Sequence, residues 1–450
     1  MRILLTTHAF LPRSVAGVEV YTARLAGALQ ELGHAVLVLA ATHDLAAPPY
    51  SLRRRALGSL DVVEIVNSHL EGTLEATYRL PAIDRAIERV LEEFRPDCVH
   101  AQHLINLSTG LVEAARLRGI PVVLTLHDYW LSCPRDGLRM QADGTLCGSV
   151  DHRVCASCLT GSPYLVPPLQ RGASRAARLL GLGRALHLAR SWTPRVTGAT
   201  LAALRRAWPV GSRGLESALD ERDDHLRRRL RDVHAILAPT RFARDRAVEW
   251  GAPADKIRVL SLGAVAGPTR PRLALPRRRF GYVGTLAQHK GVHVLLEAVR
   301  RLPGHDWTLD IVGNPAIDPG YTARLRALAH GDPRIRFRGA APPTEQERLW
   351  GGLDLLVLPS LWWENSPLTV LEALCAGLPV VASRTGGVPE LLPPSAGLLV
   401  APGDVQELRA ALLGVLEDRL LNAAHEPLPL KTSRQGAIEL AELYAEALRR

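Results

Sequence analysis

Short, continuously apolar runs alternate with amphipathic helical segments along most of this chain, in two successive series. The first series predicts strands at 3–6, 35–40, 98–101, 121–126, 235–238 and 257–261, separated by helices at 19–32, 81–93, 104–117 and 242–250. The second predicts strands at 280–283, 307–312, 335–338, 355–358 and 379–382, with helices at 292–301, 321–329, 344–351, 367–376 and 405–416. Apolar strands that alternate with helices are typical of buried parallel sheets.

The chain has 450 residues, too many for one ordinary hydrophobic core. We therefore predict an α/β protein of two doubly wound, Rossmann-like domains that face a central cleft. The predicted N-terminal domain spans 1–263 and carries a Cys-rich and Arg-rich helical insertion at about 132–232. A Pro- and Arg-rich linker at 264–279 leads to a second domain at 280–431, and the helix at 432–450 is expected to return to the first domain. Ligands of such sheets bind outside the strand carboxyl ends, so the cleft is the expected site.

Several nucleotide-site motifs are absent from the sequence. No G-x-G-x-x-G follows a strand, which argues against a nicotinamide enzyme, and there is neither a G-x-x-x-x-G-K-[ST] phosphate loop nor an H-E-x-x-H zinc motif.

The most informative segment runs from Glu364 to Glu372, two glutamates around the expected start of a helix. Asn365 or Ser366 can cap that helix, Pro367 suits its first position, and the N–H groups of Leu368 and Thr369 are then free to bind phosphate. On spacing alone, two surface glutamates beside a helix cap explain the pattern equally well.

The same segment resembles the E-x7-E signature of retaining GT-B glycosyltransferases, the group 1 or family 4 class, and the likeness continues to Glu390. The resemblance covers roughly 1–131 and 233–450. It implies a nucleotide diphosphate-sugar donor whose diphosphate lies at the helix end. One carboxylate would meet sugar hydroxyls and the other the ribose diol.

A second segment, 282–291, resembles the loop in which the family holds the diphosphate with a pair of cations. Lys290 matches the lysine of that pair, and it is one of only three lysines in the chain. Thr285 stands where the family has an arginine. His289, the helix end or an arginine from elsewhere can replace that charge. The alternative for Lys290 is a solvated surface lysine.

The N-terminal series carries the expected acceptor side. Gly17 stands in the loop that approaches the diphosphate, and Glu19 begins the next helix. His127 ends a strand where the family places a histidine across from the donor, although a lone histidine is more often structural. Asp128 can orient His127 or cap the next helix.

The resemblance implies a retaining transfer without a catalytic metal, with Glu364, Lys290 and His127 as the catalytic residues. The acceptor would be a glycan or a lipid-linked sugar, in cell-surface polysaccharide or glycoconjugate synthesis. Two alternatives stay open. A nucleotide-sugar epimerase on the same fold would need no acceptor, and a non-catalytic scaffold or nucleic-acid binder would use the basic charge.

Four cysteines, Cys133, Cys147, Cys155 and Cys158, have the spacing C-x13-C-x7-C-x2-C. A structural zinc site with four thiolate ligands, free structural thiols and a redox pair are all compatible with this spacing. A subset of the resembled family shows a similar segment, which favours a structural role.

The excess of ten basic residues, which gives the net charge of +10, lies in one segment of the chain. Residues 152–215 hold ten arginines and no Asp or Glu, so the rest of the chain has 55 − 10 = 45 basic against 45 acidic residues. Residues 165–215 fit either an anionic membrane surface or a solvated helical insert. We therefore expect a cytoplasmic protein, peripheral on the membrane in the first case, that does not bind nucleic acid.

Overall fold

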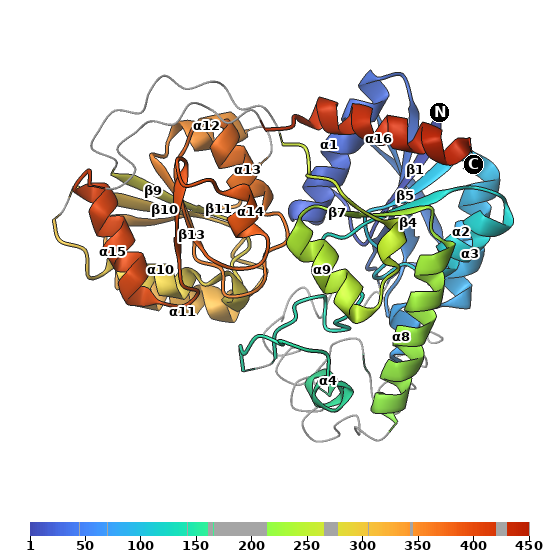
Figure 1. Ribbon diagram of the computed structural model, residues 1–450, viewed down its shortest axis with the longest axis horizontal. Helices are drawn as coiled ribbons and strands as arrows, with labels where there is room; N and C mark the ends of the chain where they lie inside the picture. The colour runs from blue at the N-terminus through green and yellow to red at the C-terminus, as the bar shows by residue number, and fades with distance from the viewer. Residues whose placement is uncertain are drawn as a thin grey trace.

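The structure is a computed structural model, and it describes residues 1–450 except 45, 70, 142, 161–164, 166–213, 265–277, 305, 343, 344, 420–429 and 450. Most of the Arg-rich segment 165–215 and of the predicted linker 264–279 therefore lies outside the described residues. The described chain forms two parallel sheets with helices on their faces, seen as two lobes in Figure 1. This mixed α/β architecture confirms the predicted fold class.

The first sheet has eight strands in the order β3-β4-β2-β1-β5-β6-β7-β8. These strands are β1 (Arg2–Thr7), β2 (Ala35–Thr42), β3 (Leu52–Leu57), β4 (Leu60–Val66), β5 (Cys98–Ala101), β6 (Val122–Thr125), β7 (Ala235–Ala238) and β8 (Ile257–Val259). All neighbours are parallel except β3 and β4, which pair antiparallel. The helices of this part are α1 (Gly17–Glu31), α2 (Pro81–Phe94), α3 (Gly110–Leu117), α4 (His152–Leu159), α8 (Leu215–Asp232) and α9 (Arg241–Trp250).

The second sheet has six parallel strands in the order β11-β10-β9-β12-β13-β14. These strands are β9 (Arg279–Val283), β10 (Thr308–Val312), β11 (Ile335–Gly339), β12 (Leu355–Leu358), β13 (Val380–Ser383) and β14 (Gly397–Val400). Its helices are α10 (Val292–Val299), α11 (Pro319–Ala329), α12 (Gln346–Gly351), α13 (Leu368–Cys375), α14 (Val388–Leu391) and α15 (Val405–Leu416). The central strands are buried on both faces, which is why they are apolar along their whole length.

The last helix, α16 (Ser433–Leu448), packs against α1 on the first lobe. Thr432 and Gln435 form a capping box that fixes where α16 begins. Tyr444 is fully buried and its hydroxyl lies 2.6 Å from Nδ1 of His100 in β5. The chain end is thereby held to the first sheet by apolar packing and by a buried hydrogen bond.

Two of the differences from the predicted elements have a clear local cause. The helix predicted at 104–117 begins only at Gly110, because Asn106 has a left-handed backbone with φ of 62°. The helix of the E-x7-E segment begins at Leu368 with Pro367 as its N-cap, one residue later than expected.

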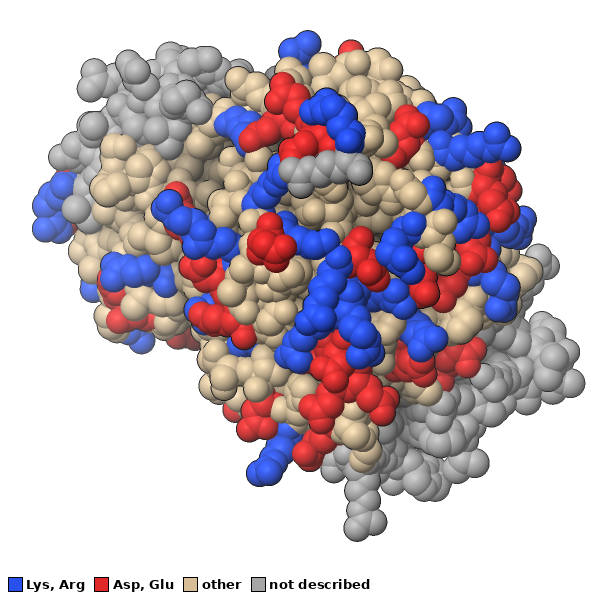
Figure 2. All heavy atoms as spheres, turned by 45° about the vertical axis from the view of Figure 1, so that its right-hand side comes forward, with Lys and Arg blue, Asp and Glu red and all other residues tan. Residues whose placement is uncertain are grey.

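Charges of both signs share the surface of the first lobe. On the face shown in Figure 2, Lys and Arg side chains are interspersed with Asp and Glu. This is the distribution expected where basic and acidic residues are equal in number outside the Arg-rich segment. No described helix is long and apolar enough to cross a bilayer.

Candidate functional site

A buried ion pair joins the two segments that the sequence singles out. Lys290 ends a 3₁₀ turn (Gln288–Lys290) that follows β9, and Glu364 lies in the loop between β12 and α13. The Lys290 Nζ and Glu364 Oε1 atoms are 2.7 Å apart, and the hydroxyl of Ser360 donates to the same oxygen at 2.5 Å. Burial alone would raise the pKa of Glu364, but the Lys290 ammonium and these hydrogen bonds together lower it. Glu364 is therefore a carboxylate at neutral pH.

The residues after Glu364 lead into a helix N-terminus. Leu368 and Thr369 are the first residues of α13, and the Pro367 N-cap provides no side-chain hydrogen bond to them. Asn365 and Ser366 are buried, and the Asn365 Oδ1 and Ser366 Oγ atoms have no hydrogen-bond partner. Free N–H groups and the dipole of a helix N-terminus favour phosphate at such a position.

The second glutamate of the signature has a partner that the sequence did not suggest. Glu372 is 5% exposed and accepts a hydrogen bond of 2.6 Å from Nη1 of Arg24 in α1. Burial raises the pKa of Glu372, and the attraction of Arg24 only partly opposes that rise. The ribose contact expected of Glu372 stays a prediction, and it requires that Arg24 share or release this carboxylate.

The loop with Glu364 is bonded directly to the first lobe. The Asn365 side-chain amide donates to the Leu126 carbonyl at 3.2 Å, and Thr240 donates to the Asn365 carbonyl at 3.3 Å. Nearby, Glu390 accepts bonds from the backbone N–H groups of Arg241 and Phe242. The carboxyl ends of β6 and β7 therefore meet the loop between β12 and α13, which we call the donor loop after its predicted ligand. A site between two doubly wound sheets requires such a meeting.

His127 follows β6 at this junction. Its Nε2 lies 2.8 Å from Oε1 of Gln102, and burial lowers the pKa of His127 to about 3. The ring is therefore neutral, and the catalytic role of His127 stays a prediction. Asp128 does not orient His127: its Oδ2 lies 2.9 Å from Nε2 of His103, and its Oδ1 accepts from the backbone N–H of Trp130.

The remaining predicted site residues differ in their surroundings. Gly17 begins α1, and open space surrounds the position of its absent side chain. Glu19 is fully buried and accepts a bond of 2.6 Å from Ser14. Its place on the acceptor side stays a prediction. Thr285 supplies a carbonyl to the Tyr282 hydroxyl at 2.7 Å.

His289 was one of the groups expected to replace the arginine missing at Thr285. Burial, followed by repulsion from Lys290, lowers the pKa of His289 to about 3. In these surroundings the ring is neutral, and its compensation for the missing arginine stays a prediction. The described positive elements of the loop are Lys290 and the end of α13.

The four clustered cysteines are free thiols. Burial, and after it the neighbouring thiols of Cys133, Cys147 and Cys158, raises the pKa of Cys155 to about 11. Arg135 donates to the Cys158 sulfur at 3.6 Å. Within the part of the chain that the structure describes, no three His, Cys, Asp or Glu side chains are arranged to hold a metal ion. The zinc site stays a prediction.

The chain is similar in sequence to known glycosyltransferases. Residues 15–159 match the family described as Glycosyltransferase Family 4, and residues 277–418 match Glycosyl transferases group 1. The amylovoran biosynthesis glycosyltransferase AmsK of Erwinia amylovora is 31% identical over 219 residues, 45% of this chain and 51% of that protein. The 2-deoxystreptamine glucosyltransferase of Streptomyces kanamyceticus is 28% identical over 347 residues, 75% of this chain and 82% of that protein. The chain thus spans about half the length of the first relative.

Solved structures share the whole fold at low identity. Sucrose-phosphate synthase from Thermosynechococcus elongatus superposes with a TM-score of 0.65 at 17% identity, over 100% of this chain and 99% of that one. HepE from Anabaena, in complex with UDP and glucose, superposes with a TM-score of 0.60 at 16% identity, over 98% and 99%. The chain belongs to the GT-B glycosyltransferases of group 1 and family 4.

Proposed function

We propose that this chain is a retaining glycosyltransferase. It moves a sugar from a nucleotide diphosphate-sugar to a glycan or lipid-linked acceptor and uses no catalytic metal. The observation that carries the proposal is the buried pair of Lys290 and Glu364 beside the N-terminus of α13. Asn365, the residue after Glu364, donates to the carbonyl of Leu126, the residue before His127.

The pair and the helix end supply what a leaving diphosphate needs. Lys290 provides a fixed cation, and the N–H groups of Leu368 and Thr369 provide oriented donors. Preorganised charge of this kind stabilises the negative charge that develops on the leaving group. We assign Glu364 to the sugar hydroxyls and Glu372 to the ribose.

Retention is proposed through a same-face transfer. Glu364 is held by Lys290 and Ser360, an arrangement that suits binding of hydroxyls better than nucleophilic attack. The acceptor oxygen forms its bond to the anomeric carbon on the face from which the diphosphate leaves. The hydroxyl proton passes to a leaving-phosphate oxygen, so no covalent sugar–enzyme intermediate is needed. Neutral His127 positions the sugar by hydrogen bonding.

The relatives support a role in polysaccharide or glycoconjugate synthesis. Their names include amylovoran biosynthesis for AmsK and O-antigen chain mannosyltransferase B in Escherichia coli. HepE from Anabaena forms a complex with UDP-glucose, and we propose that this chain likewise uses a nucleotide-sugar donor. We also propose that residues 165–215 dock on an anionic membrane surface and that the protein is cytoplasmic. These residues lie almost entirely outside the described chain.

The test is a donor screen across UDP-, GDP- and ADP-sugars, read as sugar release and as transfer, with excess EDTA in a parallel set. Glu364→Gln and Lys290→Met should each abolish turnover, while the exposed Glu92→Gln variant should keep it. NMR of the product should show the donor's anomeric configuration. Near-normal activity of both site variants, an inverted product or inhibition by EDTA would each contradict the corresponding part of the proposal.

The epimerase alternative predicts a second nucleotide-sugar from the donor alone, which the same screen detects. The nucleic-acid alternative has no support on the face in Figure 2, where the charges are mixed. A filter-binding titration with salt would reveal such binding through its steep salt dependence.

A further inference from the structure

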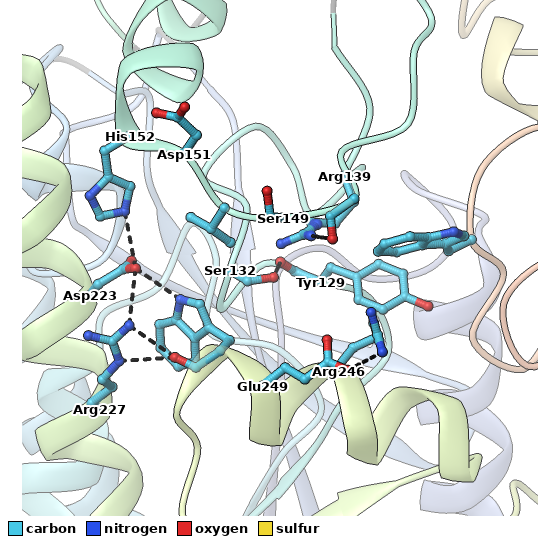
Figure 3. Close-up of a pocket in the computed structure, with 14 residues that line it drawn as sticks. Tyr129, Ser132, Arg139, Ser149, Asp151, His152, Asp223, Arg227, Arg246 and Glu249 are labelled. Carbon is cyan, nitrogen blue, oxygen red and sulfur yellow. Dashed lines mark hydrogen bonds and ion pairs between the residues drawn. The ribbon is translucent and has the colours of Figure 1, made fainter.

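A polar cavity of about 730 Å³ lies beside the donor loop, outside the site described above. Its walls come from the segment that follows β6, from α8 and α9, and from Trp363 of the donor loop (Figure 3). Arg222 in α8 is fully buried and donates to the carbonyls of Trp130 and Leu131. These hydrogen bonds attach the segment after β6 to α8, so two walls of the cavity are fixed relative to each other.

In one half of the cavity the charged side chain, Asp223, has its partners within the protein. Asp223 accepts a bond of 2.9 Å from the Trp250 indole, lies 3.2 Å from His152 Nε2, and pairs with Arg227 at 3.7 Å. Figure 3 shows these groups converging on the Asp223 carboxylate. Because the charge of Asp223 is compensated within the protein, this half has little need of an ionic ligand.

In the other half, the charge of Arg139 has no counter-charge among the described residues. Arg139 is 7% exposed, and its Nη2 donates only to neutral carbonyls, those of Cys147 at 2.8 Å and Gly148 at 3.2 Å. It has no acidic partner among the described residues, and its Nε has no hydrogen-bond partner there. A buried guanidinium without an anion is costly, so an anion from solution would be favoured beside it.

Further groups surround the same position. Arg139 and Arg246 lie over the ring of Trp363, at 5.3 and 5.7 Å from its centroid, and Arg246 also pairs with Glu249. Tyr129 lies between the two arginines in Figure 3, and its buried hydroxyl has no hydrogen-bond partner. An unused donor, two guanidinium groups and two aromatic rings suit a sugar ring that carries an anionic substituent.

The cavity is connected to the reacting centre. Trp363 immediately precedes Glu364, and a smaller cavity lined by Tyr129 and Arg246 continues to Asn365. Burial, and after it the Glu364 carboxylate, raises the pKa of Tyr129, which places its hydroxyl within the field of the donor site. A molecule bound here lies next to the donor sugar.

We propose that this cavity is the acceptor subsite, and that it selects acceptors with an anionic group, a phosphate or a carboxylate, bound by Arg139 with Tyr129 and Arg246. The proposal rests on the proposed function and names the substrate class that it leaves open. Trp363 links acceptor to donor, because the residue that contacts the arginines is covalently joined to Glu364.

The test compares three probes that share a sugar ring: methyl glucoside, methyl glucuronide and glucose 1-phosphate. Binding to the full chain is measured by calorimetry in the presence of the nucleoside diphosphate found in the donor screen. We expect at least one charged probe to bind about tenfold more tightly than the neutral glucoside, about 1.4 kcal/mol. Preference for the glucuronide indicates an acidic sugar, and preference for the phosphate indicates a phosphate-bearing acceptor.

Three variants make the test specific. Arg139→Met should remove the preference for charge, and the exposed Arg338→Met should keep it. Tyr129→Phe should weaken the charged probe several-fold without lowering the melting temperature, because the deleted hydroxyl has no partner in the protein. This second variant guards against an Arg139→Met protein that does not fold.

Equal binding of all three probes, no saturable binding of either charged probe, or a preference that survives in folded Arg139→Met protein would overturn the acceptor proposal. Its failure is distinguishable from failure of the proposed function, which is read separately by donor turnover in the wild-type protein.

Discussion

Replacing Lys290 with methionine should destabilise the protein in a way that depends on pH. The substitution keeps the length of the side chain and removes the ammonium that lies 2.7 Å from Glu364. The Lys290 and Glu364 side chains are only 18% and 4% exposed, so water cannot take the place of the missing cation. Removing one member of a buried ion pair typically costs about 3–5 kcal/mol.

The pH dependence follows from the pKa of Glu364. In the wild-type protein this pKa is lowered, so the contribution of Glu364 to stability is complete above the unfolded pKa and is lost only at acid pH. Without Lys290, the cost of burying the charge outweighs the remaining hydrogen bond from Ser360, and the folded pKa rises above the unfolded one. The folded protein then binds a proton that the unfolded chain releases, and stability falls as pH rises, by about 1.4 kcal/mol per unit.

The assay is urea unfolding of wild-type and Lys290→Met protein from about pH 5 to about pH 8, above the pKa of a glutamate in the unfolded chain. The deficit should be small at the acid end and approach about 3–5 kcal/mol at the other. Lys431→Met, which breaks a more exposed pair with Glu439, should cost at most about 1 kcal/mol at every pH.

A double variant separates the effect of the unpaired Glu364 charge from the loss of the Lys290 side chain. Glu364→Gln with Lys290→Met should be less destabilised than Lys290→Met alone at high pH, since no charge is then left without a partner. A deficit that does not change with pH, or a double variant at least as unstable as the sum of the single ones, would refute the reasoning.

Three further outcomes are expected. Gly386→Ala should greatly reduce activity and lower the melting temperature, because Gly386 has φ of 59° and a Cβ would lie 2.0 Å from the Glu364 carbonyl oxygen. Melting temperature should also fall as pH decreases below about 6.5, because the unfolded chain takes up protons that buried histidines exclude. The histidines with a folded pKa of about 3 are His100, His127 and His289. Arg24→Met should lower kcat/KM for the donor in steady-state assays and raise the pKa of Glu372 further, as seen by NMR titration; an unchanged pKa would show that Arg24 does not act on this carboxylate.

Much of the fold was predictable because buried parallel strands are apolar along their whole length. The strand at 235–238 has the predicted limits for this reason. The helix at 405–416 also has the predicted limits, because its apolar residues recur with helical spacing. The hairpin of β3 and β4 was missed. β3 reads Leu-Arg-Arg-Arg-Ala-Leu and is partly exposed at the sheet edge, so its charged residues hide the strand pattern.

The site was predictable only where its signal is local. Lys290 and Glu364 each stand in a short motif, and the structure brings them together. Arg24 and Glu372 are 348 residues apart, and neither sequence context indicates that they pair. Tyr129 and Trp363 likewise meet only in the folded chain, with ring centroids 5.8 Å apart. Long-range partners depend on how the two sheets are placed, which local patterns do not encode.

This placement also bears on how the site works. The donor loop is bonded to the first lobe through Asn365, by its amide to Leu126 and by its carbonyl to Thr240. Any motion that separates the sheets must break these bonds and move Glu364 away from His127. Because Asn365 is buried with an unused Oδ1, breaking them leaves further polar groups without partners unless water enters. The loop that carries Glu364 therefore stays at the carboxyl ends of β6 and β7 only while the two sheets are together.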